Sequence, residues 1–382
     1  MDKKILFFTT PAFGHINSTL PIIEKLINDG YKIFCYSNKE YKKAIEGIGA
    51  IFIEYKIKFN INDIEKYTSN FVELLKALTD LNHKAYELYI DEIDYSDVDL
   101  ILYDSMCSFA KNVAYKKKKK SVCIETTLAY NLLVFLFSNM FWKSFKTFIR
   151  FRKDLIFNIK EEKEFRKIYK LPKLKVVDLF VNSGDKTIVL TPKEIQPFVK
   201  TFNKNFYFVG TTIRERLNKQ NKEYKKRYRY FISLGSIYKL RVEDLKEIFK
   251  NNDLKDSKIA VIFNKDINIE NVDIYKFVDQ ISFLKHVDIF INHGGLNSVY
   301  EAIYLNVKQI SIPMQEEQRL TALICKHKKI GGYAKDYKKL NKEIKDVNKY
   351  NKNLSKYSKI MQSYDGTNLA CKIIDKYINE GI

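Results

Sequence analysis

The chain has 382 residues, with 67 Lys and Arg against 46 Asp and Glu, a formal net charge of +21, and 46% hydrophobic residues. This length is sufficient for two cored domains, and the apolar content excludes a disordered chain. No uninterrupted apolar run approaches the ~20 residues that cross a bilayer, and the first residues lead into a short strand-like run without the long apolar core of a signal peptide, so we expect neither a membrane-spanning nor a secreted protein.

The first half of the chain predicts alternating strands and helices. Residues 4–10 form a continuous apolar run, residues 11–15 break it, and a helical apolar pattern then continues to Asp29 and Gly30. Further strands are predicted at 31–36, 50–55, 98–103, 122–126, 185–190 and 206–209, with helices at 62–92 and 106–115. This alternation is typical of a parallel sheet covered by helices.

Residues 128–151 are dense in aromatic side chains and include Trp142, which is the single tryptophan. Two interpretations stay open: the segment covers a lipophilic ligand site, or it packs as a thick core helix.

A second alternating set follows a polar segment. Residues 211–229 are almost wholly charged and polar, without apolar periodicity, as in a linker. Strands are then predicted at 230–234, 258–263, 287–291 and 308–312, helices at 241–250 and 296–305, and a closing amphipathic helix at 366–379.

These elements predict an α/β protein with two doubly wound, Rossmann-like domains that face a central cleft, where ligands bind beyond the carboxyl ends of the strands. The expected boundaries are an N-terminal Rossmann-like domain at 1–210, a linker at 211–229, a C-terminal Rossmann-like domain at 230–365 and a closing helix at 366–382.

Cysteine use and charge distribution narrow the function further. The cysteines are odd in number, widely spread and include no C-x-x-C pair, which argues against a disulfide framework and a zinc site and favours the cytoplasm. Lysine is scattered along the chain, and its densest run, residues 116–120, is interpreted as a solvated turn. A nucleic-acid-binding protein would gather its basic residues in a patch, so we expect no nucleic-acid partner. The five cysteines are Cys35, Cys107, Cys123, Cys325 and Cys371.

The segment directly after the strand at 287–291 has the composition of an anion site. Gly294 and Gly295 let the backbone turn sharply and approach a ligand, and the helix that begins there directs free N–H groups at it. Asn297 and Ser298 either cap that helix or donate to phosphate oxygens, and His293 can donate to a further oxygen. A plain helix cap, the alternative, requires neither the histidine nor two glycines.

Two further positions extend this predicted site toward a sugar. Glu301 lies one helical turn on, where its carboxylate can accept hydrogen bonds from neighbouring hydroxyls such as those of a ribose. Glu317 and Gln318 follow the next strand and can bind a polyhydroxylated ring. Neither the G-x-G-x-x-G pattern of dinucleotide-binding sheets nor the P-loop pattern is present there, which disfavours hydride and kinase chemistry.

Together these residues resemble the nucleotide-sugar-dependent glycosyltransferases of family 1, which have the GT-B fold, and among them the macrolide-type bacterial enzymes. The resemblance spans nearly the whole chain. Its segments are Phe-Thr-Thr-Pro-Ala-Phe-Gly-His-Ile-Asn at 8–17, Tyr-Asp-Ser-Met-Cys at 103–107, Ser-Leu-Gly-Ser at 233–236, Val-Asp-Gln at 278–280, His-Gly-Gly-Leu-Asn-Ser-Val-Tyr-Glu-Ala at 293–302 and Glu-Gln at 317–318.

The resemblance implies that the N-terminal domain at 1–210 binds the acceptor and that the C-terminal domain at 230–365 binds the nucleotide-sugar donor. Glu301 matches the position on the ribose, Ser236 a position near the phosphates, and Glu317 with Gln318 the pair on the donor sugar. The full set of matched donor positions is Ser236, Val278, Gln280, His293, Gly294, Gly295, Asn297, Ser298, Glu301, Glu317 and Gln318.

The resemblance also implies that His15 is the catalytic base and Asp104 the carboxylate that orients it and stabilises its protonated form. His15 would take the proton of an acceptor hydroxyl as that hydroxyl attacks the anomeric carbon, and the diphosphate would leave with inversion. Helix dipole and N–H groups would meet the charge on the leaving group, so no metal and no other cofactor is expected.

Three features depart from the family pattern or compete with it. Ser18, Asp279 and Lys308 stand where the family usually has proline. Plant members stack uracil on a tryptophan shortly before the position of Gln280, where this chain offers only Phe277. Asp97-Val98-Asp99 matches the Asp-x-Asp of metal-dependent glycosyltransferases, but it precedes its strand and is interpreted as a solvated turn.

The sequence thus predicts a cytoplasmic inverting glycosyltransferase that moves a hexose, expected to be glucose, from UDP to a hydroxyl of a lipophilic small molecule. One alternative is a membrane-surface enzyme that glycosylates a lipid, with peripheral contact through residues 116–120 and 142–153. Another is a non-catalytic partner protein with a nucleotide-sugar fold, which the presence of His15, Asp104 and Glu301 disfavours.

Overall fold

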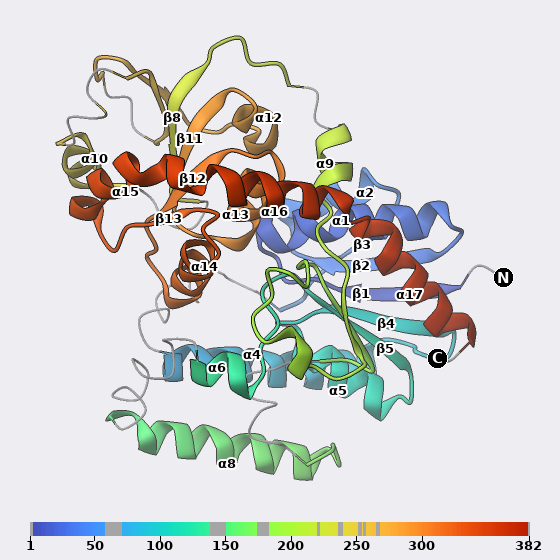
Figure 1. The fold of residues 1–382 in the computed structure, drawn as a ribbon. Helices are drawn as coiled ribbons and strands as arrows, with labels where there is room; N and C mark the ends of the chain where they lie inside the picture. Colours follow the sequence, from blue (N-terminus) through green and yellow to red (C-terminus); the bar gives the residue numbers. More distant parts are fainter. Residues whose placement is uncertain are drawn as a thin grey trace. The chain divides into compact units, whose positions relative to one another are not determined.

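The protein consists of two compact units, each built on one parallel sheet (Figure 1). One unit comprises Met1–Thr212 and Asp365–Ile382, and the other comprises Ile213–Tyr364. The computed structural model describes residues 3–57, 71–137, 150–173, 183–219, 222–235, 240–250, 254, 257–264 and 268–380. The predicted α/β class with two parallel sheets is confirmed.

The first unit contains a seven-stranded sheet in the order β3-β2-β1-β4-β5-β6-β7, with every neighbouring pair parallel. The strand order reverses between β1 and β4, so their carboxyl ends flank the place where ligands bind in such sheets. The strands are β1 (Lys4–Phe8), β2 (Lys32–Ser37), β3 (Ile51–Glu54), β4 (Val98–Asp104), β5 (Lys120–Glu125), β6 (Lys186–Val189) and β7 (Phe206–Phe208).

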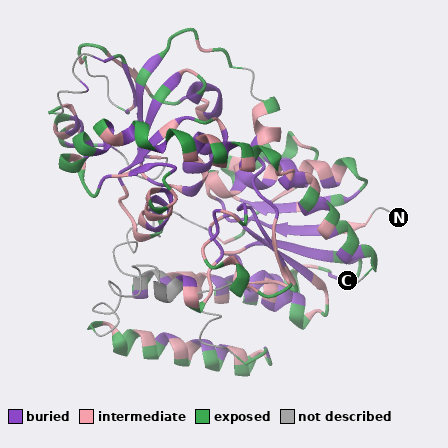
Figure 2. Ribbon diagram, viewed as in Figure 1, coloured by how far each residue is buried: buried purple, intermediate pink, exposed green. Residues whose placement is uncertain are grey.

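Helices cover both faces of this sheet because its strands alternate apolar side chains between them. Ile5 and Phe7 of β1 face the core beneath α1 and α17, while Leu6 and Phe8 face the core beneath α4 and α5. Figure 2 shows the central strands β1, β4 and β5 as largely buried. The helices are α1 (Phe13–Asn28), η1 (Lys39–Tyr41), α2 (Lys42–Glu46), α4 (Phe71–Glu92), α5 (Ser108–Lys116), α6 (Leu132–Phe137), α8 (Arg152–Ile168), η3 (Val199–Thr201) and α17 (Gly366–Glu380).

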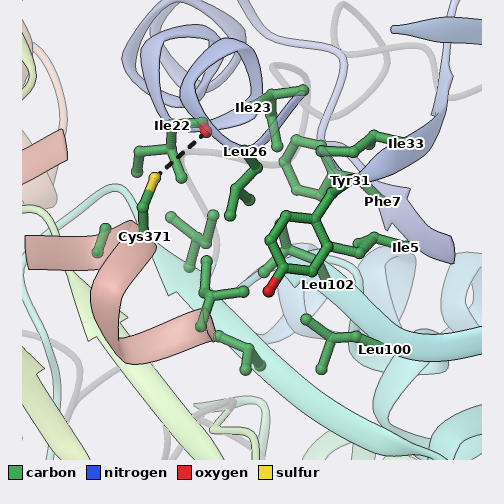
Figure 3. Close-up of a cluster of buried hydrophobic side chains, with 14 of the residues drawn as sticks. Ile5, Phe7, Ile22, Ile23, Leu26, Tyr31, Ile33, Leu100, Leu102 and Cys371 are labelled. Atoms are coloured by element: carbon green, nitrogen blue, oxygen red, sulfur yellow. Dashed lines mark hydrogen bonds between the residues drawn. The ribbon is translucent and has the colours of Figure 1, made fainter. Parts of the chain in front are cut away.

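The C-terminal helix α17 belongs to the first unit. Figure 3 shows the shared core, where the Cys371 thiol donates to the carbonyl of Ile22 in α1 at 3.5 Å. Lys120 Nζ donates to the carbonyls of Tyr377 and Ile378 at 3.0 and 2.9 Å. A cation on these last carbonyls complements the negative end of the helix dipole.

The lysine run at 116–120 is therefore more than the solvated turn that the sequence predicted. Besides Lys120, Lys116 Nζ donates to the carbonyl of Tyr169, and Lys119 Nζ to that of Ser96. Three ammonium groups of the run stabilise the ends of neighbouring segments, which explains their clustering without an anionic partner.

The second unit contains a six-stranded parallel sheet in the order β10-β9-β8-β11-β12-β13, which reverses between β8 and β11. Apolar cores lie on both faces. The strands are β8 (Tyr228–Ser233), β9 (Ile259–Ile262), β10 (Val272–Tyr275), β11 (Val287–Asn292), β12 (Lys308–Ser311) and β13 (Gly332–Tyr333). The helices are α9 (Ile213–Lys219), α10 (Val242–Phe249), α12 (Gln280–Leu284), α13 (Leu296–Tyr304), α14 (Glu316–His327), η4 (Tyr337–Lys339), α15 (Leu340–Asp346), η5 (Val347–Tyr350) and α16 (Asn351–Ser363).

The structure contains helices and strands that the sequence did not predict. The polar segment predicted as a linker contains the helix α9. Because this helix has little apolar surface of its own, it depends on tertiary contacts for its stability. The edge strands β10 and β13 were not predicted. Neither were the helices α8, α12, α14, α15 and α16. Half of the aromatic segment, residues 138–149 with Trp142, lies outside the described residues. Among the residues that are described, no helix is long and apolar enough to cross a membrane.

Candidate functional site

His15 lies in the first turn of α1, immediately beyond the carboxyl end of β1. Its Nδ1 is 2.7 Å from Oδ2 of Asp104, the last residue of β4. The two side chains meet because β1 and β4 are neighbours in register, with Phe8 beside Tyr103. The structure thus brings together the two residues predicted as catalytic.

Asp104 is buried, and both of its carboxylate oxygens form hydrogen bonds. Its Oδ1 accepts from Thr10 Oγ1 at 2.6 Å and from the backbone N–H of Met106 at 3.0 Å. Burial by itself raises the pKa of the Asp104 carboxyl, but the charge of His15 and the hydrogen bonds from His15, Thr10 and Met106 outweigh it and hold the pKa below its ordinary value. Asp104 is therefore an anion placed to stabilise a positive charge on His15.

Thr126 is a third member of this group that the sequence analysis missed. Its Oγ1 lies 2.8 Å from His15 Nδ1 and 3.4 Å from Asp104 Oδ2. The residue directly follows β5, the strand next to β4, so its position at the same sheet edge was the available signal. With Nδ1–H donated to Asp104, the lone pair of His15 is on Nε2, which can accept a proton.

In the second unit, the turn between β11 and α13 is shaped by glycine. Gly294 has φ +83°, and a Cβ there would lie 2.7 Å from the carbonyl oxygen of Gln318. A Cβ at Gly235 or at Gly295 would lie within 3.0 Å of the His293 ring. Glycines therefore allow both the turn and the packing of the imidazole between two segments of backbone.

His293 is held as a neutral imidazole. Burial lowers its pKa to about 4, and a hydrogen bond with the backbone of Ser233 acts in the opposite direction. Among the described residues no group forms a hydrogen bond with its buried Nδ1. A neutral ring with an unsatisfied polar atom is suited to a hydrogen bond with a ligand.

A buried polar network behind this turn was also missed. Asn292 Oδ1 accepts from the N–H of Gly294 at 2.7 Å and from Ser311 Oγ at 2.8 Å, and its Nδ2 donates to Gln309 Oε1 at 3.1 Å. All three side chains are buried on β11 and β12. The network holds the glycine turn to the sheet, and the signal was polar side chains inside predicted core strands.

Glu301, predicted on the ribose, is buried on α13 and binds two partners. Its Oε1 accepts from Arg216 of α9 at 2.6 Å, and its Oε2 accepts from Gln280 at 2.6 Å. Gln280 Nε2 also donates to Ser298 Oγ at 3.0 Å. The structure therefore joins three predicted donor residues with Arg216, which sequence reasoning had assigned to the linker.

Gln318 and Glu317, predicted on the donor sugar, begin α14. The Gln318 side-chain carbonyl accepts from the N–H groups of Met314 and Gln315 at 2.9 and 3.2 Å, so it caps its own helix. Its amide N–H groups are not used by this cap. Glu317 is exposed beside it.

The remaining predicted donor residues have different environments. Val278 is buried in the apolar core with Phe283. Phe277 beside it is 70% exposed. Asn297 lies in the first turn of α13, whose N-cap Gly295 provides no side-chain cap. Ser236 lies outside the described residues.

Asp97 and Asp99 lie at the amino end of β4, the edge opposite to Asp104. Asp97 pairs with Lys4 Nζ at 2.9 Å, and Asp99 Oδ2 accepts from the N–H of Lys4 at 2.8 Å. Both carboxylates thus stabilise the start of β1.

Comparison with known proteins places this geometry in context. A family model described as the glycosyltransferase family 28 C-terminal domain matches residues 206–369. The NDP-glycosyltransferase YjiC of Bacillus licheniformis is 29% identical over 345 residues, covering 84% of this chain and 82% of that protein. A protein of Bacillus subtilis named uncharacterized UDP-glucosyltransferase YojK is 26% identical over 348 residues, covering 84% and 82%.

Solved structures share the fold over the whole chain. The glycotransferase of kitacinnamycin superimposes with a TM-score of 0.84 at 16% identity, covering 99% of this chain and 100% of that one. CalG4, the calicheamicin glycosyltransferase, gives a TM-score of 0.78 at 18% identity, covering 100% and 99%.

Proposed function

Because the chain belongs to the family 1 glycosyltransferases with the GT-B fold, we propose that it transfers glucose from UDP-glucose to a hydroxyl of a lipophilic small molecule, with inversion. The observation that carries the proposal is the hydrogen-bonded pair of His15 and Asp104 at the strand-order reversal of the first sheet. This pair supplies a base for an acceptor hydroxyl, which a purely nucleotide-binding protein does not need.

In the proposed reaction, Nε2 of His15 accepts the proton of the acceptor hydroxyl as its oxygen attacks the anomeric carbon. The ionised Asp104 stabilises the imidazolium that forms, and Thr126 helps to fix the ring. The bond from the anomeric carbon to the diphosphate breaks on the opposite face, so the configuration inverts.

We propose that the second unit binds the donor without a metal ion. The N-terminus of α13 directs N–H groups and its positive dipole end toward the diphosphate, and the ring of His293 lies beside the same glycine turn. Glu301 has capacity for ribose hydroxyls, because a carboxylate offers about four acceptor positions and only two hydrogen bonds to it are found among the described residues.

UDP is the proposed nucleotide and glucose the proposed sugar. The names of the curated relatives, an NDP-glycosyltransferase and a UDP-glucosyltransferase, favour this donor. The backbone of Val278 and the exposed ring of Phe277 are the proposed contacts to the base. The acceptor is proposed to be lipophilic because of the aromatic composition of residues 128–151.

The outer face of α8 supports a second candidate, an enzyme that glycosylates a lipid at a membrane surface. Ile156, Phe157 and Ile168 are 52%, 54% and 72% exposed, and exposed lysines share their face of the helix, at Lys153, Lys160 and Lys167. Figure 2 shows this exposed side of α8. Apolar side chains among lysines suit an anionic bilayer.

Sedimentation with phosphatidylglycerol and phosphatidylcholine vesicles tests this candidate. Salt-sensitive binding to the anionic vesicles that the Ile156→Ser, Phe157→Ser double variant abolishes would favour it. Leu132→Ser, which changes an exposed apolar residue of α6, is the matched control. Equal binding by all three proteins, or by none, removes the candidate.

Calorimetric titration with UDP and with TDP, each with and without EDTA, tests the donor proposal. We expect metal-independent UDP binding that His293→Ala weakens about tenfold or more, because the glycine turn loses the ring against which it packs. His327→Ala, an exposed histidine of α14, should bind like the wild type. Binding of neither nucleotide would overturn the donor assignment.

A further inference from the structure

Glu125 is a second buried carboxylate beside the His15–Asp104 pair, and the reaction described above does not use it. It ends β5, the neighbour of β4. Its side chain shares a sheet face with Cys123, beneath α4 and α5, whereas Asp104 shares the opposite face with Leu102. The two carboxyl groups therefore flank one sheet edge from opposite sides.

A single oxygen of Glu125 joins the two segments that carry the ligands of His15. Its Oε1 accepts from Ser105 Oγ at 3.1 Å, from the N–H of Thr127 at 3.1 Å and from Thr127 Oγ1 at 2.6 Å. Ser105 directly follows Asp104, and Thr127 directly follows Thr126. Asp104 and Thr126, which both contact His15 Nδ1, are thus each adjacent in sequence to a residue held by Glu125.

Burying the Glu125 carboxyl beside Asp104 lowers the stability of the fold, so stability by itself does not explain why a glutamate stands here. Burial raises the pKa of Glu125 to about 7, the hydrogen bonds from Thr127 and Ser105 lower it, and the negative charge of Asp104 raises it further. A glutamine would offer the same acceptor oxygen without the cost of burying a charge close to another carboxylate. A carboxylate is therefore best explained by an effect of its charge.

We propose that Glu125 is a positioning residue for the catalytic pair. It fixes Asp104 and Thr126 against Nδ1 of His15 through Ser105 and Thr127, and in its ionised form its negative charge strengthens the field that stabilises protonated His15. The catalytic consequence rests on the proposed function of His15 as the base.

Other titratable groups act at the same place and must be considered with Glu125. The negative charge of Asp104 on β4 acts electrostatically on Glu125. Glu125, Asp104 and Cys107 act electrostatically on the Cys123 thiol of β5, and so does the positive charge of Lys111 on α5. Since burial raises the pKa values of Cys107 and Cys123, neither thiol carries charge near neutral pH.

Titration of the histidine rings by NMR tests the proposal without any substrate, and the chain has only five histidines. The His15 signal is assigned by its loss in His15→Gln. We expect Glu125→Gln, which keeps an acceptor oxygen but removes the charge, to lower the pKa of His15 by about half a unit or more. Identical His15 titration in the wild type and in Glu125→Gln would overturn the effect of charge.

Glu162→Gln is the matched control. Glu162 is another buried carboxylate of the first unit, but its Oε2 pairs with His83 at 2.5 Å. The control should leave the titration of His15 unaltered. A His15 shift of equal size in both variants would indicate a general structural disturbance and contradict the proposal.

Ser105→Ala tests the positioning contact separately and keeps the test valid if a Glu125 variant does not fold. It removes one hydrogen bond to Oε1. We expect a changed chemical environment of the His15 ring and a lower kcat with little change in KM for the donor. Unchanged ring signals and unchanged kcat would contradict the role of the contact.

A double-mutant cycle then connects the residue to catalysis. We expect Glu125→Gln to lower kcat about tenfold in the wild type and to have no effect in a His15→Ala background, because the charge acts through His15. Equal losses in both backgrounds would overturn the catalytic role. If the NMR coupling is present and no transfer activity is found, the proposed function fails while the positioning role stands.

Discussion

Two histidines that each follow a strand of a parallel sheet have opposite environments in this protein. His15 in the first unit forms a hydrogen bond to the buried anion Asp104, whereas His293 in the second unit lies between glycine backbones, and burial lowers its pKa to about 4. An adjacent carboxylate favours protonation of an imidazole, and burial without one keeps the ring neutral. The first is therefore suited to accept a proton and the second to form a hydrogen bond as a neutral ring.

The largest expected effect comes from removing the first histidine. His15→Ala should reduce transfer by a factor of about 10² to 10⁴, the usual contribution of a general base, while donor affinity stays unchanged. Asp104→Asn should give a loss of the same order, because the imidazolium loses its stabilising charge. Transfer rates and calorimetric UDP binding measured on the same preparations check both. Loss of UDP binding in His15→Ala would contradict this assignment, because it would show that His15, like His293, takes part in donor binding.

Each unit also buries a carboxylate with a different partner. In the second unit Glu301 pairs with Arg216, whereas in the first unit Asp104 pairs with His15. Arg216→Ala should lower the free energy of unfolding by about 3 kcal/mol, because it leaves a buried carboxylate without its cation. Urea denaturation checks this, and Arg227→Ala, whose side chain is largely exposed beside Asp288, is the control. A similar stability in both variants would contradict the buried pair.

A buried group in each unit makes the free energy of unfolding depend on pH, with opposite sign. His293 has a folded pKa of about 4 against 6.5 in the unfolded chain, so its contribution is lost as the pH falls from 6.5 toward 4. Glu125 has a folded pKa of about 7 against 4.5, so its contribution is lost as the pH rises from 4.5 toward 7. Each effect is on the order of 1–3 kcal/mol, and they oppose each other between pH 4.5 and 6.5.

Single variants uncover the opposing slopes. Between pH 4.5 and 6.5, the free energy of unfolding should rise more steeply with pH in Glu125→Gln than in the wild type. In His293→Ala it should rise less steeply than in the wild type, or fall. Denaturation midpoints at pH 4.5 and pH 6.5 check the signs. Parallel pH profiles for the three proteins would contradict both assignments.

The smallest expected effect concerns the glycines around His293. Gly295 has φ −62°, so Gly295→Ala adds a methyl group without backbone strain, but within 3.0 Å of the imidazole. We expect UDP affinity to fall about tenfold, since overpacking typically costs about 1–3 kcal/mol. In a His293→Ala background the same change should have little effect, because the ring is gone. Equal losses in both backgrounds would show that the methyl group acts on the ligand or the helix itself.

Local patterns predicted most of the elements that carry the site. The strand ends before His15 and His293, Asp104 at the end of its strand, and the glycine turn before α13 are all visible in short segments, because each depends on a few neighbouring residues. Arg216 was not recognisable, since a seven-residue polar helix resembles a linker until its partner Glu301 is known.

The sequence by itself determined the α/β class, the two alternating sets of strands and helices, and the family motifs, because these follow from apolar periodicity and from residues adjacent along the chain. Tertiary structure alone decided which polar groups meet: Thr126 with His15, Asn292 with the N–H of Gly294, and Glu125 with Ser105 and Thr127. The meeting of Thr126 with His15, 111 residues apart, depends on the order and register of neighbouring strands. The strength of such hydrogen bonds and ion pairs depends on exclusion of water, which only the packed sheets provide.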